Sequence, residues 1–189
     1  MNTLAPTLTT RHLPAVKPAV RDLGLILLGS LVVAACAQIA IPLPFTPVPL
    51  TGQTFAVLLV GAALGSKRGA TSLGLYTIEG ALGLPFFAAG KSGLSGPTIG
   101  YLIGFIVAAY VIGLLAERGL DRSLRTAILP FLLGTIVIYL FGAAWLAVSL
   151  KMTPADAFAA GVYPFLIGDA IKLLLAGLVL PAAWKLTKE

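Results

Sequence analysis

Long stretches without any charged residue constrain this chain more than any other feature of its sequence. The longest runs from Leu23 to Ser66, and similar runs extend from Ser92 to Ala116 and from Thr126 to Leu150. The hydrocarbon core of a bilayer is about 30 Å thick and requires roughly 20 apolar residues per helix. Each run is therefore long enough to cross a membrane, and the sequence predicts an all-α integral membrane protein.

The composition supports the same conclusion. Hydrophobic residues make up 58% of the 189 residues and charged residues only 11%, whereas a soluble domain carries about 25% charge. These values exclude a water-soluble globule and a disordered chain, and a single cysteine excludes a disulfide scaffold. The chain itself is not expected to be an ATPase, because Gly90-Lys91-Ser92 has Pro85 where a phosphate-binding loop requires a glycine.

Residue patterns for catalysis or metal binding are absent from the sequence. The one histidine, His12, lies near the N-terminus, and there is no HExxH motif and no pair of cysteines. A serine or threonine nucleophile inside the membrane would therefore have no histidine base. We expect neither an enzyme nor a metal site, and no cofactor.

Prolines divide the longest run into two helices. Four prolines between residues 42 and 49 remove backbone donors and disfavour the helical conformation, so the first helix is expected to end near Ile41. The second helix then continues to about Ser66. Two more apolar segments are interrupted only by ionisable residues, 69–87 by Glu79 and 163–184 by Asp169 and Lys172. The prediction is a bundle of six transmembrane helices.

Basic residues are unevenly distributed between the segments that join these helices. With the N-terminus inside the cell, the inner segments contain ten of the 13 lysines and arginines, and the outer loops contain only Lys91 and Lys151. Because Lys and Arg concentrate on the cytoplasmic side, both termini are predicted to be cytoplasmic. The net charge of +6 then reflects topology, and no nucleic-acid partner is expected. The ten inner residues are Arg11, Lys17, Arg21, Lys67, Arg68, Arg118, Arg122, Arg125, Lys185 and Lys188.

This topology divides the chain into two parts. Residues 1–21 are expected to form a flexible cytoplasmic arm, and residues 22–189 a multi-pass domain in the cytoplasmic membrane. The proline-rich loop, the loop from Ala88 to Gly96 and the loop from Lys151 to Asp156 are expected to face outward.

Two ionisable residues lie close together inside the last predicted helix. Asp169 and Lys172 are three residues apart and share one helix face. Charges inside a membrane are costly and usually face the protein interior. The pair is either a structural ion pair that fixes helix packing or part of a binding site. In a site, Lys172 would bind an anionic group and Asp169 would accept hydrogen bonds from N–H donors.

Other polar residues are predicted near the same outer level. Glu79 is a further candidate for a site, or a carboxylate that reaches water at the interface. Gln53, Thr51 and Thr54 follow the proline loop and could donate hydrogen bonds to a ligand. For the two threonines, N-capping of the second helix is the favoured interpretation.

Four segments together resemble the BioY family of biotin transporters. They are Ala37–Thr54, Glu79–Ala88, Gly96–Tyr101 and Gly168–Lys172. The resemblance implies a six-helix protein with cytoplasmic termini that binds biotin near the outer surface. It implies that Asp169 and Lys172 form the polar core of the site and that Gln53, Glu79 and Tyr101 contribute to it. Biotin has a carboxylate and a ureido ring with N–H donors and a carbonyl, which suits such a site.

The resemblance also implies protein partners. Family members serve as substrate-binding S components of energy-coupling factor (ECF) transporters, with a transmembrane coupling protein and cytoplasmic ATPase subunits, and some act alone. A small-residue face on the first helix contacts the coupling protein, and here Ser30 and Ala34 occupy that face. Two alternatives remain open, an S component for another small vitamin and a membrane scaffold that transports nothing.

Overall fold

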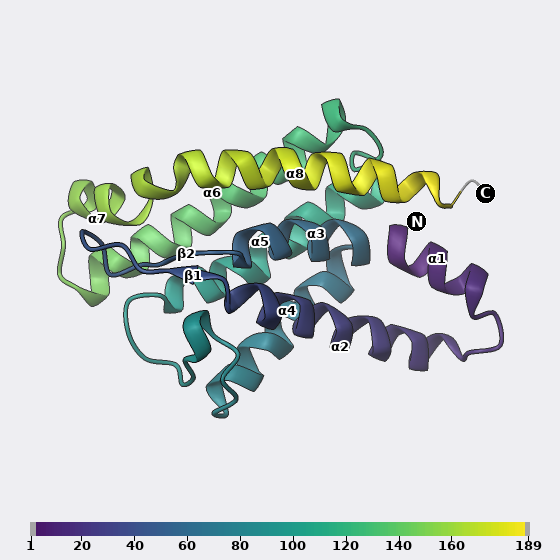
Figure 1. The fold of residues 1–189 in the computed structure, drawn as a ribbon, viewed down its shortest axis with the longest axis horizontal. Helices are drawn as coiled ribbons and strands as arrows, with labels where there is room; N and C mark the ends of the chain where they lie inside the picture. Colours follow the sequence, from purple (N-terminus) through teal and green to yellow (C-terminus); the bar gives the residue numbers. More distant parts are fainter. Residues whose placement is uncertain (1–2, 188–189) are drawn as a thin grey trace.

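A computed structural model describes residues 3–187 of the chain, and this part is almost entirely helical (Figure 1). Lys188, one of the ten basic residues assigned to the inner side, lies outside the described residues, as do residues 1 and 2 of the predicted arm. The elements are α1 (Leu4–His12), α2 (Pro18–Ala37), β1 (Ala40–Ile41), β2 (Leu50–Thr51), α3 (Gln53–Leu64), α4 (Ser66–Ala81), the 3-10 helix η1 (Ala88–Gly90), α5 (Ile99–Glu117), α6 (Leu124–Ser149), α7 (Pro154–Gly161), the 3-10 helix η2 (Tyr163–Phe165) and α8 (Leu166–Lys185).

The six predicted helices correspond in order to α2, α3, α4, α5, α6 and α8. Within the described residues, four helical stretches are long and apolar enough to cross a membrane. Helices α3 and α4 are shorter, with 12 and 16 residues. At 1.5 Å per residue, α3 is about 18 Å long, which is less than the hydrocarbon core. The four stretches are Pro18–Ala37, Ile99–Glu117, Leu124–Ser149 and Pro154–Lys185.

Proline and glycine set several of the helix ends. The predicted proline loop occupies residues 42–49 and is closed by a short antiparallel hairpin, in which Ala40 pairs with Thr51 and Ile41 with Leu50. A tight turn separates α3 from α4 at Gly65, whose φ of 86° is accessible to glycine at little cost. Helix α5 begins at Ile99, after the predicted loop from Ala88 to Gly96, where positive-φ glycines and Pro97 interrupt the helical conformation.

Helix α5 lies at the centre of the bundle and contacts α3, α4 and α6. Glycines on α5 allow close approach. A side chain at Gly104 would lie 3.1 Å from the Ile138 Cα atom of α6, and one at Gly113 would collide with the backbone at Ser66. These two glycines therefore serve close packing of helices within the bundle.

The prediction of a flexible N-terminal arm is wrong for the residues described. Residues 4–12 form helix α1, which contacts α2 and α3. Thr3 and Leu4 are only 2% and 6% exposed. Burial of these side chains gives the segment a fixed place against the bundle, which the polar composition of the arm did not indicate.

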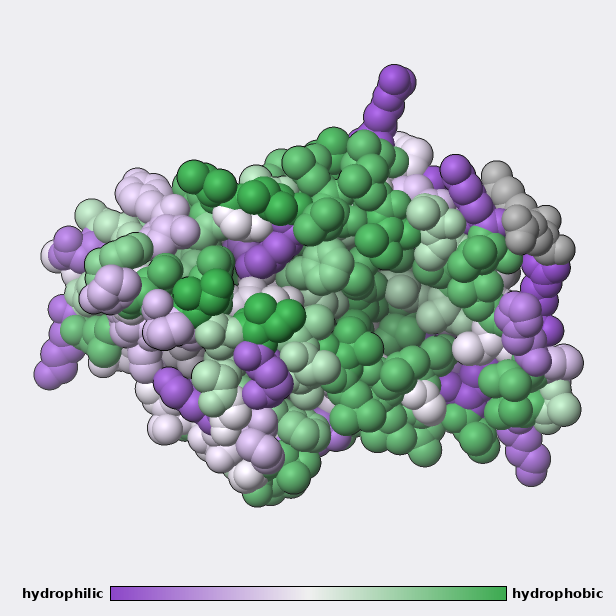
Figure 2. Space-filling view, viewed as in Figure 1, coloured by the Kyte–Doolittle hydropathy of each residue, from purple (hydrophilic) through white to green (hydrophobic). Residues whose placement is uncertain are grey.

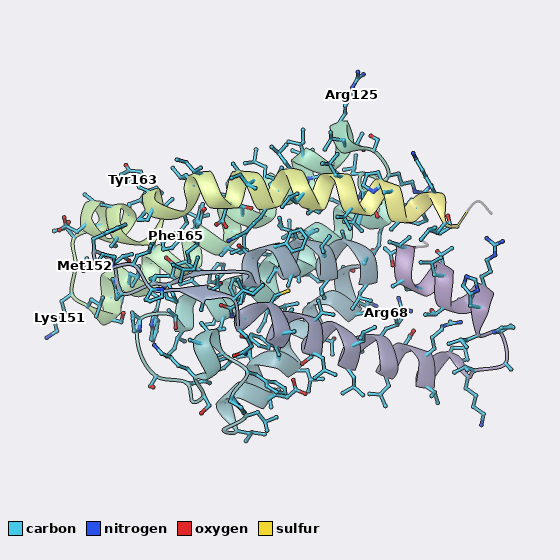
Figure 3. All side chains as sticks on the ribbon, in the orientation of Figure 1. Arg68, Arg125, Lys151, Met152, Tyr163 and Phe165 are labelled. Carbon is cyan, nitrogen blue, oxygen red and sulfur yellow. The ribbon has the colours of Figure 1, made fainter. Side chains whose placement is uncertain are left out.

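The two ends of the bundle differ in charge and structure. Both termini of the described chain lie near the α3–α4 turn and the C-terminus of α5 (Figure 1). This side of the bundle is called here the basic end. The hairpin, η1 and α7 form the opposite end, called here the loop end. Figure 2 shows a wide hydrophobic surface between them, and Figure 3 places Arg68 and Arg125 toward the basic end and Lys151 at the loop end. This arrangement matches the predicted separation of basic residues.

Candidate functional site

A cavity lies near the loop end, between four helices and two loops. Its volume is about 60 Å³, and its walls come from α3, α5, α6 and α8, from the hairpin loop and from the segment before η1. Most of the surface is apolar, with a few polar groups from α3, α6 and α8. The lining residues are Val48, Pro49, Thr51, Gln53, Thr54, Phe87, Ala88, Thr98, Tyr101, Leu102, Phe105, Ile138, Tyr139, Phe165, Asp169 and Lys172.

Asp169 and Lys172 form the charged part of this cavity. The Lys172 Nζ atom lies 2.8 Å from Asp169 Oδ1, and their side chains are only 17% and 5% exposed. Their spacing of three residues places both on the cavity side of α8, as the sequence predicted. Such a pair is costly to bury unless further hydrogen bonds satisfy both partners.

Those further hydrogen bonds are present for Lys172. Its ammonium group also donates to the Thr51 carbonyl at 2.6 Å and to Thr54 Oγ1 at 3.0 Å. An ammonium group has three N–H donors, and the chain therefore supplies one acceptor for each. The Thr51 carbonyl stands at the end of β2, so the hairpin itself contributes to the site.

Asp169 is equally well satisfied. Thr54 Oγ1 donates to Asp169 Oδ1 at 2.8 Å, and the Tyr139 hydroxyl of α6 donates to Asp169 Oδ2 at 2.6 Å. The carboxylate thereby joins α3, α6 and α8. Hydrogen bonds to a charged acceptor are shorter and stronger than neutral ones, so this group is held in one orientation.

The uncharged polar groups continue around the cavity. Gln53 is 6% exposed, and its Nε2 donates to the Tyr76 hydroxyl at 2.7 Å. The Tyr101 hydroxyl donates to the Gly161 carbonyl at 2.6 Å, which connects α5 to the end of α7. Gln53 and Tyr101, both predicted site residues, therefore line the cavity with fixed orientations.

Aromatic and aliphatic side chains form the rest of the wall. Phe87, Phe105 and Phe165 surround the cavity with Leu102 and Ile138. Figure 3 shows Phe165 on the inner side of η2, whereas Tyr163 points outward and is 62% exposed. An apolar wall with a few fixed polar groups is typical of a site for a small organic molecule.

Glu79 does not line the cavity, contrary to the prediction. Its carboxylate accepts a hydrogen bond from the Ser30 hydroxyl and so joins α4 to α2. Ser30 is fully buried and Ala34 is 5% exposed. Ser30 and Ala34, which the resemblance placed on a face that contacts a coupling protein, are therefore buried within this chain. The surface of α2 outside the bundle instead carries large side chains such as Leu27, Leu28 and Leu31.

Sequence reasoning missed Tyr139 and misjudged Thr54. Gly52 occupies the N-cap position of α3 with no side-chain cap, and the Thr54 hydroxyl bonds to Asp169 instead of capping the helix. A signal for Tyr139 existed, since a tyrosine hydroxyl within an uncharged helix needs a buried partner.

The cavity is smaller than a small-molecule site, which typically has at least about 300 Å³. Val48 and Pro49 from the hairpin loop and Phe87 and Ala88 from the other loop form part of its wall. A ligand larger than this cavity therefore requires movement of these loops or of other lining side chains. Among residues 3–187, no group of three or more His, Cys, Asp or Glu side chains could hold a metal ion.

Comparison with known proteins gives a consistent match over most of the chain. The model of the family described as "BioY family" matches residues 6–189. The probable biotin transporter BioY of Pyrococcus horikoshii is 39% identical over 162 residues, which cover 84% of this chain and 93% of that protein. The biotin transporter BioY of Rhodobacter capsulatus is 40% identical over 166 residues, which cover 81% and 87%.

A solved structure is similar as well. The crystal structure of the S-component for biotin from an ECF-type ABC transporter matches with a TM-score of 0.79 and 26% identity. The match covers 88% of this chain and 92% of that protein. The fold is thus that of a known S component, and the relatives are named as transporters and not as enzymes.

Proposed function

Because the chain belongs to the BioY family, we propose that it is a membrane subunit that binds biotin and mediates its uptake. The observation that carries the proposal is the Asp169–Lys172 pair in the apolar cavity at the loop end. Its neighbours supply the donors, acceptors and apolar wall that a partly polar vitamin requires.

The short distance within the ion pair determines which part of biotin it meets. Asp169 Oδ1 and Lys172 Nζ are 2.8 Å apart, whereas an aliphatic chain separates the ureido ring of biotin from its carboxylate. Both side chains therefore meet the same end of the ligand. A ureido group has N–H donors for Asp169 and a carbonyl acceptor for Lys172, whereas a carboxylate beside Asp169 would be repelled. We assign the ureido ring to this pair.

This assignment modifies the expectation that Lys172 binds the anionic group. A ureido ring is neutral, so its binding leaves the ion pair balanced in a site of low dielectric. Thr54 and Tyr139 keep the Asp169 carboxylate oriented toward the ring. Gln53 and Tyr101 line the same cavity as further polar contacts, and the biotin chain would follow the apolar wall.

The proposed orientation of the protein in the membrane follows from its charge distribution. We place the basic end on the cytoplasmic side of the cytoplasmic membrane, with both termini inside and the cavity opening outward. Six helices cross the bilayer, and α3 is short because it begins at the depth of the cavity. The S-component match supports operation with a coupling protein and ATPase subunits, and the alternative is uptake by this subunit alone.

Titration calorimetry of the purified protein with biotin tests this proposal. Binding with a Kd below micromolar is expected, and desthiobiotin, which keeps the ureido ring, should compete for the same site. Absence of binding by a folded protein would contradict the proposal. Binding of a different vitamin with no response to biotin would favour the alternative S component.

A further inference from the structure

A second cavity lies at the basic end, far from the residues of the proposed biotin site. Its volume is about 580 Å³, and it is bounded by α1, the segment between α5 and α6, and the end of α8. In Figure 1 these elements meet where both ends of the chain lie. The lining residues are Thr7, Arg122, Ser123, Pro181, Trp184, Lys185 and Thr187.

The aromatic wall of this cavity is held in place from behind. Trp184 Nε1 donates a hydrogen bond to Asp121 Oδ2 at 2.7 Å, and Asp121 is fully buried. On the other side, the Arg122 guanidinium carbon lies 4.9 Å from the centre of a Trp184 ring. A cation over an indole face is attracted to it, so Arg122 is oriented before any ligand arrives.

The charge at this cavity is positive and unbalanced. Within residues 3–187, neither Arg122 nor Lys185 has a carboxylate within 4.0 Å, since the described ion pairs involve other residues. Of the two nearby acids, Asp121 bonds to Trp184, and Glu117 accepts from the backbone and hydroxyl of Ser66. Two cations that line the same cavity suit the oxygens of a phosphate group.

The surroundings favour a phosphate that is attached to a lipid. Leu124 on α6 follows the lining residue Ser123 in the chain and is exposed, as are Ile128 one turn further along α6 and Leu178 two turns before Lys185 on α8, so acyl chains could contact them. Trp184 is an amphipathic ring of the kind found at membrane interfaces. Basic pockets between transmembrane helices are known to hold anionic lipid head groups.

We propose that this cavity binds the phosphate group of an anionic phospholipid, with Arg122 and Lys185 as its cationic ligands and Trp184 as its wall. Bound lipid would join α1, the α5–α6 segment and α8 at the basic end. No residue that lines this cavity lines the biotin cavity, so the two sites use different side chains.

Fluorescence quenching offers a direct test because Trp184 is one of only two tryptophans. In a Trp145→Phe background, Trp184 becomes the single fluorophore. The protein in neutral detergent micelles is titrated with brominated phosphatidylglycerol or brominated phosphatidylcholine. We expect preferential quenching by phosphatidylglycerol and about fivefold weaker apparent affinity for it in Arg122→Gln or Lys185→Gln.

Arg125→Gln is the matched control, because Arg125 projects away from the bundle and does not line the cavity (Figure 3). It should keep the affinity of the parent protein. Equal quenching by the two lipids, or equal losses in Arg122→Gln and Arg125→Gln, would overturn the proposal. Relief of quenching by millimolar inorganic phosphate would assign the site to free phosphate and overturn the lipid assignment. Unchanged quenching in that phosphate arm supports it.

Discussion

The ion pair between Asp169 and Lys172 can be tested for its two possible roles, fold and ligand binding, with one set of variants. Asp169→Asn and Lys172→Met each remove one charge, and the double variant removes both. Asparagine keeps an acceptor for the Tyr139 hydroxyl, and methionine keeps most of the lysine side chain's length. The three variants therefore separate the effect of an unpaired charge from the loss of the pair itself.

The expected loss of stability follows from burial. Removal of one partner from a buried ion pair costs about 3–5 kcal/mol, because the other charge stays buried without compensation. The Lys172 side chain is 17% exposed, so partial hydration places the cost near the lower limit, about 3 kcal/mol. For a protein of this size, that corresponds to a Tm lower by roughly 6–12 °C. The double variant has no unpaired charge and should recover most of the difference.

Biotin binding should not recover in the double variant. Hydrogen bonds to charged groups contribute about 1.5–3 kcal/mol each, and the ureido ring loses two of them. The affinity is thus expected to fall by at least about 100-fold in the double variant. Titration calorimetry measures the affinity, and thermal unfolding in detergent measures the stability.

Lys151→Met is the matched control, since Lys151 is an exposed lysine at the loop end outside the cavity. It should change neither Kd nor Tm. Wild-type affinity in the double variant would refute the assignment of the ureido ring to this pair. A double variant as unstable as both single variants would refute the argument from unpaired charge.

Three further variants test other contacts. Tyr139→Phe removes the donor to Asp169 Oδ2 and should weaken biotin binding about tenfold by calorimetry, whereas an unchanged Kd would contradict its role. Glu79→Gln alters the contact with Ser30 and should lower Tm by a few degrees without changing Kd; a loss of affinity would restore Glu79 to the site. Burial raises the pKa of Asp121, and the hydrogen bond from Trp184 only partly opposes this. Its neutral form is therefore the one favoured by folding, so stability should fall as pH rises from about 4 through the raised pKa. The Asp121→Asn variant should lack this fall. Tm measured from pH 4 to 7 for the parent protein and for the variant should therefore diverge, and two parallel curves would contradict the prediction.

The features that the sequence predicted best are those that depend on residues close together in the chain. Apolar runs predicted the four helical stretches that could cross a membrane, because a spanning segment must satisfy its own backbone hydrogen bonds there. The spacing of Asp169 and Lys172 placed both on one helix face because the helix period alone decides it. The separation of basic residues was also predicted, since it depends only on which segments join which helices.

Contacts between helices were harder to predict. The pairing of Ser30 with Glu79 depends on how α2 and α4 are rotated toward each other, and no local pattern specifies that rotation. A family pattern assigned Ser30 to a partner and Glu79 to the ligand, while the structure joins the two. Helix α1 was missed for a similar reason, because its burial comes from contacts with α2 and α3 and not from its own composition.

The hydrogen bonds of the cavity explain how so small a site can select its ligand. Each donor of Lys172 already has a partner within the chain, so a ligand carbonyl must replace one of these partners. Asp169 Oδ2 accepts from Tyr139 alone and can accept a second donor, so a neutral ring with adjacent N–H and carbonyl groups can bind without leaving either charge unmatched. A ring without the N–H groups would leave the Asp169 carboxylate short of a donor in a buried site, at a cost of about 1–3 kcal/mol or more for a charged group. Discrimination at this end therefore arises chiefly from the cost of unpaired groups, which the surrounding apolar wall increases by excluding water.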